Sequence, residues 1–316
     1  MARIFKTKQS QASFVASTQG RIQLSRNYHT QQLLCKLVVN HNNASANFKS
    51  EHFANLINAI QIVANGDKTI KHVDVKKLVY NALYHNGKAM HNSIVTADGA
   101  AKVSTIYFTV DFSMRGMAKP SDTIENSALY NTFDMMIDWG SASKVGTGVT
   151  INSATLTVSS SQLVNYSRNP GERIAHNIET QLSEDITSTT TEHQINLPIK
   201  KVYRRFLIAG LVDNVRNNAL IKGVKVKSGT TVFMEWDADD LRAFNIDKHN
   251  IRTETDADGL LLIDFSERGR VSDALDTRGQ FNTLELVLDV EKQAGTNKVI
   301  VYSDVFDVEP TVEVKG

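Results

Sequence analysis

Short apolar runs alternate along the whole chain with polar segments rich in Thr, Ser and Asn. In residues 155–158 (TLTV) and 224–227 (VKVK), apolar and polar residues alternate one by one, which is the period of a strand with one buried face. The runs predict strands near residues 20–25, 32–40, 57–64, 68–73, 104–113, 131–138 and 148–159, and again near 193–198, 203–213, 221–227, 230–236, 259–265, 281–290 and 297–308.

The two groups of strands carry matching segments. Residues 111–116 (DFSMRG) and 264–269 (DFSERG) are identical at five of six positions, and each follows an apolar run. Upstream, three residues recur at a constant spacing of 163, as Gly66 and Gly229, Asp74 and Asp237, and Leu78 and Leu241. The glycine suits a turn between two strands, and the aspartate suits a helix N-cap. The first helix is expected to run to about His85 and to stop at Gly87.

A third match opens each half. Ile22-Gln23-Leu24 precedes Tyr28 and an apolar strand, and Ile195-Asn196-Leu197 precedes Tyr203 and another. The matches keep the same order while their offset falls from 173 to 163 to 153, so the second copy has shorter loops. Seven or eight strands per copy favour a jelly roll over a meander.

We therefore predict an all-β chain of two tandem eight-stranded jelly rolls, a double β-barrel with short helices in the loops. The expected divisions are a basic N-terminal arm at 1–18, a first jelly roll at 19–165, a linker at 166–190 and a second jelly roll at 191–316.

Composition limits the function classes. Apolar residues make up 41% of the 316 and charged residues 22%, which is typical of globular domains. The single cysteine, Cys35, lies in an apolar run and is expected to be a small buried hydrophobe. The longest apolar run, 206–212, is too short to span a membrane, and the N-terminus does not resemble a secretory signal.

The net charge of +1 hides an uneven distribution. Residues 1–50 contain seven Lys and Arg and no acid, whereas residues 254–316 contain fourteen acids and six bases. We expect Arg3, Lys6 and Lys8 in the N-terminal arm to contact an anionic surface, such as lipid headgroups or nucleic acid, or a neighbouring subunit. The alternative is ordinary surface charge exposed to solvent.

The sequence offers no catalytic constellation. It has no paired histidines of the cupin type, no Gly-x-Ser-x-Gly elbow and no phosphate-binding loop. We therefore predict no enzyme activity, no catalytic residue and no bound cofactor or metal. The alternative is calcium, which could be bound by carboxylates at the acidic cluster 237–240 or the turn 256–259. Arg115 and Arg268, which recur in the repeat, are expected to anchor loops.

A family resemblance rests on Ile22, Leu24, Tyr28, Ile60, Ile62 and Gly66. Over residues 20–85 the chain resembles the N-terminal domain of double jelly-roll major capsid proteins of tailless, membrane-containing icosahedral viruses, such as corticoviruses and tectiviruses. In that family two jelly rolls stand side by side in each subunit, and three subunits form a pseudo-hexagonal trimer that tiles the shell over an internal membrane.

The resemblance implies a major capsid protein that forms homotrimeric capsomers of an icosahedral virion. A bacteriophage is among the viruses it implies. Its partners would be copies of itself, other virion proteins such as a penton, and the internal viral membrane, with no specific recognition of nucleic acid. It would be located in the virion and assembled in the host cytoplasm. The alternatives are a carbohydrate-binding or glycan-active double jelly roll and a phage tail or spike component. Sugar sites usually expose aromatic rings, and both tryptophans, Trp139 and Trp236, are expected to be buried.

Overall fold

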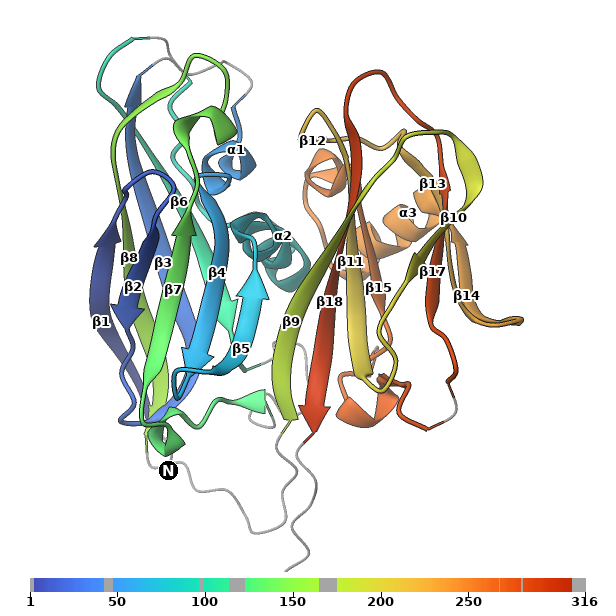
Figure 1. The fold of residues 1–316 in the computed structure, drawn as a ribbon, viewed down its shortest axis with the longest axis horizontal. Coiled ribbons are helices and arrows are strands. Elements are labelled where there is room, and N and C mark those ends of the chain that lie inside the picture. The colour runs from blue at the N-terminus through green and yellow to red at the C-terminus, as the bar shows by residue number, and fades with distance from the viewer. Residues whose placement is uncertain are drawn as a thin grey trace, which may run out of the picture. The chain divides into compact units, whose positions relative to one another are not determined.

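The computed structural model describes residues 3–42, 48–96, 99–113, 123–164, 175–266, 268–279 and 281–308. The chain forms two compact units that divide between Asn177 and Ile178, and residues 83–88 are grouped with the second unit. Figure 1 shows strands as the main elements of both units. Among the described residues, no helix is long and apolar enough to cross a membrane.

The first unit contains two four-stranded antiparallel sheets. One has the order β1-β8-β3-β6, and the strands of the other follow the order β2-β7-β4-β5. The strands are β1 (Arg3–Ser13), β2 (Gln19–Gln23), β3 (His29–Asn42), β4 (Ile57–Ala64), β5 (Lys68–Val73), β6 (Lys102–Asp111), β7 (Phe133–Trp139) and β8 (Thr150–Val164).

The second unit repeats this plan. Its strands follow the orders β9-β18-β11-β15 and β10-β17-β13-β14, and two short strands, β12 and β16, also pair with β11. The strands are β9 (Ala175–Asp185), β10 (Thr190–Asn196), β11 (Val202–Val212), β12 (Val215–Arg216), β13 (Ile221–Ser228), β14 (Thr231–Asp237), β15 (Leu260–Asp264), β16 (Leu275–Asp276), β17 (Glu285–Val290) and β18 (Asn297–Val308).

Both units have the strand order of a jelly roll. When β12 and β16 are set aside and the remaining strands of each unit are numbered by chain order, both units read first-eighth-third-sixth and second-seventh-fourth-fifth. Such crossing connections distinguish a jelly roll from an up-and-down barrel. The predicted tandem pair of eight-stranded jelly rolls is confirmed.

The matched segments occupy equivalent places in the two units. Gly66, with φ of +84°, follows β4, and Gly229, with φ of +56°, follows β13. Asp74 accepts a hydrogen bond from the backbone N of Lys77 at 2.8 Å, and Asp237 accepts one from the backbone N of Asp239, also at 2.8 Å. The helices that follow the two aspartates are therefore capped by the same residue type in both copies.

The helices are short and connect strands. They are α1 (Ser50–Ala54), α2 (Val75–Asn86) and α3 (Ala238–Lys248), with 3-10 turns η2 (Ser127–Leu129), η3 (Ala142–Lys144), η4 (Glu254–Ala257) and η5 (Val271–Asp273). As predicted, α2 ends just before Gly87, which has φ of +66°.

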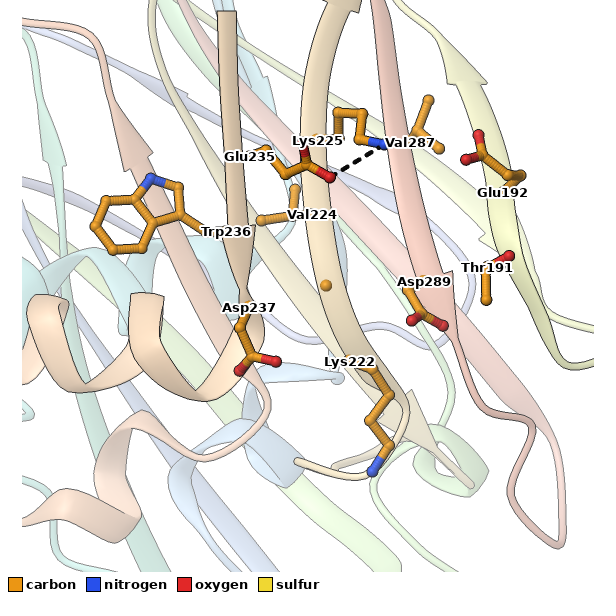
Figure 2. A pocket seen from close by; sticks show the side chains of 11 residues that line it. Thr191, Glu192, Lys222, Val224, Lys225, Glu235, Trp236, Asp237, Val287 and Asp289 are labelled. Atoms are coloured by element: carbon orange, nitrogen blue, oxygen red, sulfur yellow. Dashed lines mark ion pairs between the residues drawn. The ribbon is translucent and has the colours of Figure 1, made fainter. Parts of the chain in front are cut away.

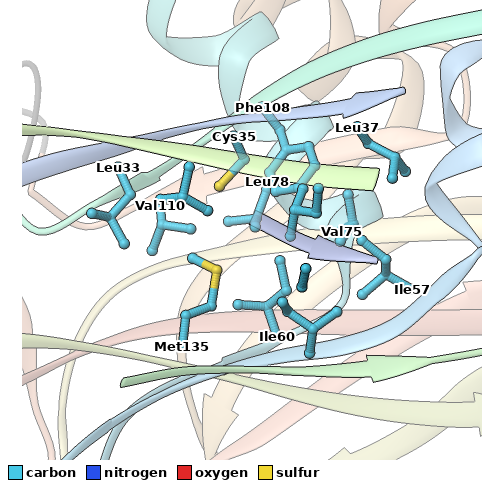
Figure 3. Packing of buried hydrophobic residues seen from close by; sticks show 14 of the residues in the cluster. Leu33, Cys35, Leu37, Ile57, Ile60, Val75, Leu78, Phe108, Val110 and Met135 are labelled. Atoms are coloured by element: carbon cyan, nitrogen blue, oxygen red, sulfur yellow. The ribbon is translucent and has the colours of Figure 1, made fainter. Parts of the chain in front are cut away.

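Alternation along the strands builds the core of the first unit. In β3, Leu33, Cys35 and Leu37 point inward and are at most 1% exposed, whereas Leu34 and Lys36 point outward. Figure 3 shows the inward residues packed against Phe108. The predicted burial of Cys35 is confirmed. Burial raises the pKa of its thiol, so the group stays protonated and unreactive.

The second unit has its own core. Strand β11 is buried along nearly its full length, and Phe206 and Ile208 are completely covered. Val224, Leu286 and Val301 pack in the same cluster. Each jelly roll therefore buries a separate set of side chains between its two sheets, as a barrel of this size requires.

The first strand of each unit differs from the sequence-based divisions. Residues 3–13, assigned above to a basic arm at 1–18, form β1, which pairs with β8 from Arg3↔Val164 to Ser13↔Thr155. Residues 175–185, assigned to the linker at 166–190, form β9, while 165–174 lie outside the described residues. Both strands contain mostly polar residues, so hydrophobic alternation does not reveal them; their pairing with the last strand of the unit supplies the backbone hydrogen bonds.

Candidate functional site

The outer face of the β1-β8-β3-β6 sheet carries the predicted lysines. Lys6 lies opposite Ser161 and Lys8 opposite Ser159 in the β1–β8 ladder, and both side chains are exposed. Lys36 on β3 is exposed on the same outer face. We call this surface the basic face and define it by Lys6, Lys8 and Lys36, together with the exposed apolar residues Ile4, Leu34 and Val103.

The basic face exposes apolar side chains as well as lysines. Ile4 is 59% exposed, Val103 49% and Leu34 39%. The outward positions of β8 between residues 155 and 161 are hydroxyl residues, among them Thr157, which lies opposite Lys36. Small hydroxyl side chains leave the sheet surface accessible, so lysines and apolar residues are free to contact a partner.

The second unit carries a hollow of about 360 Å³ on the outer face of the β10-β17-β13-β14 sheet. Gly223 lies at its floor and lacks a side chain to fill it, and Asp237 and Asp289 are its partners on the two neighbouring strands. Figure 2 shows Asp289, Asp237 and Glu192 around this space. We call this surface the acidic face and define it by the carboxylates of Glu192, Glu235, Asp237, Glu285 and Asp289.

Three lysines of the acidic face are already neutralised within the chain. Lys225 pairs with Glu235 at 3.1 Å, and Lys227 pairs with Glu285 at 3.3 Å. Lys222 pairs with Glu291 at 3.2 Å. In the described part of the chain, neither Glu192 nor Asp289 has an ion pair or a side-chain hydrogen bond. The face therefore retains negative charge that its own lysines do not balance.

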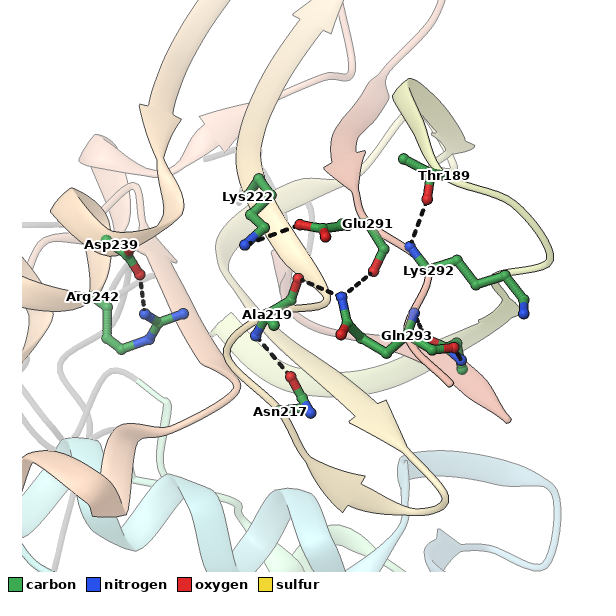
Figure 4. Close-up of polar contacts among 10 residues, drawn as sticks. Thr189, Asn217, Ala219, Lys222, Asp239, Arg242, Glu291, Lys292 and Gln293 are labelled. Atoms are coloured by element: carbon green, nitrogen blue, oxygen red, sulfur yellow. Dashed lines mark hydrogen bonds and ion pairs between the residues drawn. The ribbon is translucent and has the colours of Figure 1, made fainter. Parts of the chain in front are cut away.

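The loops at one end of this hollow are held by hydrogen bonds between side chains and backbone groups. Gln293 donates from Nε2 to the carbonyl of Glu291 at 2.9 Å and to that of Ala219 at 3.3 Å. The backbone N of Lys292 donates to the Thr189 hydroxyl at 2.9 Å. Figure 4 shows these bonds beside the Lys222–Glu291 pair. The rim is thus positioned by loop contacts that leave the carboxylates facing solvent.

The two tryptophans have different environments. Trp139 is completely buried, as predicted. Trp236 is 36% exposed and stacks on Phe244, with ring centroids 5.7 Å apart and planes at 24°. The prediction that Trp236 is buried was therefore wrong, because β14 is the outer strand of its sheet and the stack on Phe244 of α3 leaves the ring partly exposed.

Two histidines, the buried His176 and the half-buried His249, have contrasting electrostatic surroundings. His176 Nδ1 lies 3.0 Å from Glu125 Oε2, and the Tyr130 hydroxyl donates to the other carboxylate oxygen. Burial opposes the charge on Glu125, but the bonds from His176 and Tyr130 outweigh it and lower the pKa of the carboxyl. Burial and the nearby Lys248 charge instead lower the pKa of His249 to about 4. Both settings fit structural roles within their units.

The acidic clusters considered for calcium have protein partners. Asp237 caps α3, and Asp239 pairs with Arg242 at 2.5 Å. Asp258 accepts a hydrogen bond from the Asn218 side chain at 2.6 Å. Within the described ranges, no group of three or more His, Cys, Asp and Glu could hold a metal ion. The expectation that the chain binds no metal stays a prediction, as does the calcium alternative at these two clusters.

The remaining candidate residues are three arginines. Arg268 pairs with Asp273 at 3.0 Å, as expected for a loop anchor, while Arg115 lies outside the described residues. Arg3 begins β1. Sequence reasoning missed Lys36 and the acidic face. Lys36 belongs to the basic segment 1–50, but three of the five carboxylates lie outside the acidic segment 254–316 and meet the others only through sheet pairing.

Two tandem jelly rolls of the same strand order define a double jelly-roll protein. The fold presents two exposed sheet faces of opposite charge, and within the described residues it shows no metal-binding cluster.

Comparisons with known proteins agree. Residues 187–304 match the family model of the viral coat protein P2 N-terminal domain. The STIV MCP, from Sulfolobus Turreted Icosahedral Virus, superimposes with a TM-score of 0.70 at 16% identity over 97% of both chains. The major capsid protein P2 of Bacteriophage PM2 gives 0.65 at 11% identity over 98% of both chains. The PBCV-1 virus capsid gives 0.70 at 10% identity over 98% of this chain and 94% of that chain.

No curated protein matches the chain. At these identities the structural likeness establishes the fold, which is that of double jelly-roll major capsid proteins of icosahedral viruses. The resemblance inferred from sequence is confirmed, but the family model matches the second unit, whereas the resemblance was traced along residues 20–85 of the first. Because the two units share one strand order, a model of one jelly roll can match either.

Proposed function

We propose that this chain is a major capsid protein of an icosahedral virus and that three copies form a pseudo-hexagonal capsomer. The observation that carries the proposal is the repetition of one jelly-roll strand order in both units. Three subunits with two equivalent barrels each supply six barrels, which is what a hexagonal outline needs. The solved structures with the same fold are virion components, which supports a structural role in the virion instead of catalysis.

The solution mass of the purified chain tests this proposal. We expect a stable particle of about three times 35.0 kDa, with a hexagonal outline in electron micrographs. A strict monomer at all concentrations would contradict the proposal. The matched control is the same chain in a denaturant, which must give a single 35.0 kDa species.

Further partners follow from the same proposal. Capsomers of one kind leave the fivefold vertices to a different protein, so a penton protein is an expected partner. An internal membrane is a second expected partner, and virion assembly is expected in the host cytoplasm. Copurification of the penton and lipid with the chain from virions would test these expectations.

Carbohydrate binding is the second candidate function, and the exposed stack of Trp236 on Phe244 favours it. Sugar rings pack on exposed aromatic faces. If this stack is a sugar site, a W236A variant loses glycan binding in a titration that detects binding by the unmodified chain. An absence of binding to a broad glycan array removes this candidate.

A further inference from the structure

We propose that the basic face of one copy of this chain docks on the acidic face of a second copy. The inference rests on the proposed capsid function and deepens it by naming the surfaces that join the subunits. The contact involves Lys6 and Lys8 on one side, and Glu192 and Asp289 on the other.

The basic face carries lysines on β1 and β3 with almost no opposing carboxylate in its sheet. The four strands β1, β8, β3 and β6 contain one carboxylate, Asp111. That carboxylate is 8% exposed and accepts hydrogen bonds from Gln32 and Thr109 within the chain. Lys6 and Lys8 have no ion pair in the described part of the chain, and both are exposed. Their charge is therefore available to a partner.

The acidic face offers the opposite charge in a concave setting. Its lysines are paired with Glu235, Glu285 and Glu291, so the carboxylates of Glu192 and Asp289 remain in excess. These two carboxylates line the hollow above Gly223, as Figure 2 shows. A lysine side chain that enters this hollow can place its ammonium group between the two carboxylates while its apolar stem packs along the sheet.

Charge complementarity identifies a second copy of the chain as the partner. Both faces are exposed in the single chain, and each belongs to a four-stranded sheet with opposite unbalanced charge. The basic face also exposes Ile4 and Leu34, which supply apolar area that a charged contact alone lacks. Because the two faces differ, the contact is head to tail, and head-to-tail contacts close into rings when the rotation fits. A ring of three satisfies the proposed capsomer.

A charge-reversal series on the full chain tests the proposal. The variant Lys6→Glu/Lys8→Glu places two acids against Glu192 and Asp289. The control Lys88→Glu/Lys144→Glu changes the net charge equally at exposed positions off both faces. The rescue variant adds Glu192→Lys/Asp289→Lys to the first pair. Mass and dissociation are measured by sedimentation at several concentrations, with circular dichroism to check folding.

We call the Lys6→Glu/Lys8→Glu protein the face variant. We expect the concentration at which its assemblies dissociate to be at least about tenfold higher than that of the control. The rescue variant should assemble like the wild type. Raising the salt from about 0.1 M to about 1 M shortens the Debye length from about 10 Å to about 3 Å, and should weaken the wild-type contact more than that of the face variant.

Four results would overturn the inference. If the wild type and the face variant assemble equally well, the proposed docking surfaces are wrong and the capsid proposal stands. If the wild type is a monomer, the capsid proposal itself is contradicted. If the face variant forms large aggregates, the lysines serve to block the free β1 edge. If it keeps trimers but loses binding to vesicles of anionic phospholipid, the lysines contact a membrane.

Discussion

Asp74 and Asp237 show how a repeat acts at the scale of single residues. Asp74 follows the fifth strand of its unit and Asp237 ends the equivalent strand, and each accepts a backbone N–H in the first turn of a helix. Because an N-cap depends on local geometry, the sequence spacing alone was enough to predict both. Trp236 shows the converse, since its 36% exposure depends on which strand lies at the outside of the sheet.

His249 gives a pH prediction at this scale. Its pKa lies at about 4 in the folded chain, below the ordinary value of 6.5, mainly because of burial. Between these two values the unfolded chain binds a proton that the folded chain does not, so stability falls as the pH drops through this window. Urea unfolding at about pH 7 and about pH 5 should show this loss, and an H249Q variant should show a smaller one.

The control for this experiment is H91Q, which changes an exposed histidine. It should keep the wild-type dependence on pH. An H249Q variant whose stability falls as steeply as that of the wild type would show that other groups cause the acid loss.

Glycines with positive φ give a second residue-scale prediction. Gly259 has φ of +68°, and a Cβ there would lie 2.6 Å from the backbone N of Asn217 and 3.0 Å from the carbonyl O of Gly210. Gly229 has φ of +56° with nothing within 4 Å. G229A should therefore cost only backbone strain, about 1–2 kcal/mol, whereas G259A should cost more than about 3 kcal/mol.

Chemical denaturation of the two variants measures this difference. Equal losses of stability in the two variants would mean that the backbone of β11 and β12 shifts to accommodate the new methyl group at residue 259. The comparison is matched because both glycines lie in turns of the second unit and differ mainly in what surrounds them.

At the scale of elements, the first strand of each unit marks the limit of sequence patterns. The interior strands β3 and β11 were predicted well because buried strands need apolar residues. Strands β1 and β9 contain few such residues, and their strand conformation depends on pairing with strands far along the chain. Local sequence cannot supply that partner, which is why β1 was expected to be an arm.

Removing β1 is therefore expected to damage the first jelly roll. The deletion of residues 1–13 exposes the backbone of β8 and uncovers the core beside Ala12, which is 8% exposed. We expect a loss on the order of 5 kcal/mol, measured by urea unfolding. The Lys6→Ala/Lys8→Ala variant keeps the strand and should lose less than about 1 kcal/mol.

This pair separates the strand from its charges. If the deletion leaves stability unchanged, β1 adds nothing to the barrel and an arm becomes the better description. If the alanine variant is as unstable as the deletion, the lysines stabilise the unit itself and are not reserved for a partner.

At the scale of the whole molecule, assembly should couple to stability. Because a trimer binds only folded subunits, its melting temperature should rise with protein concentration. Calorimetry of the wild type over a hundredfold range of concentration should show this rise, and the Lys6→Glu/Lys8→Glu variant should show a smaller one. A melting temperature independent of concentration would contradict assembly in that range.

The sequence by itself determined the tandem duplication, seven of the eight sheet strands in each copy, the capped helices and the burial of Cys35. Each of these depends on residues near one another in the chain or on strand periodicity, both of which can be read from sequence. Only the tertiary structure decided that residues 3–13 complete a sheet, that Trp236 is exposed, and that five carboxylates from three strands form one face. These features depend on which strands become neighbours, and long-range pairing decides that.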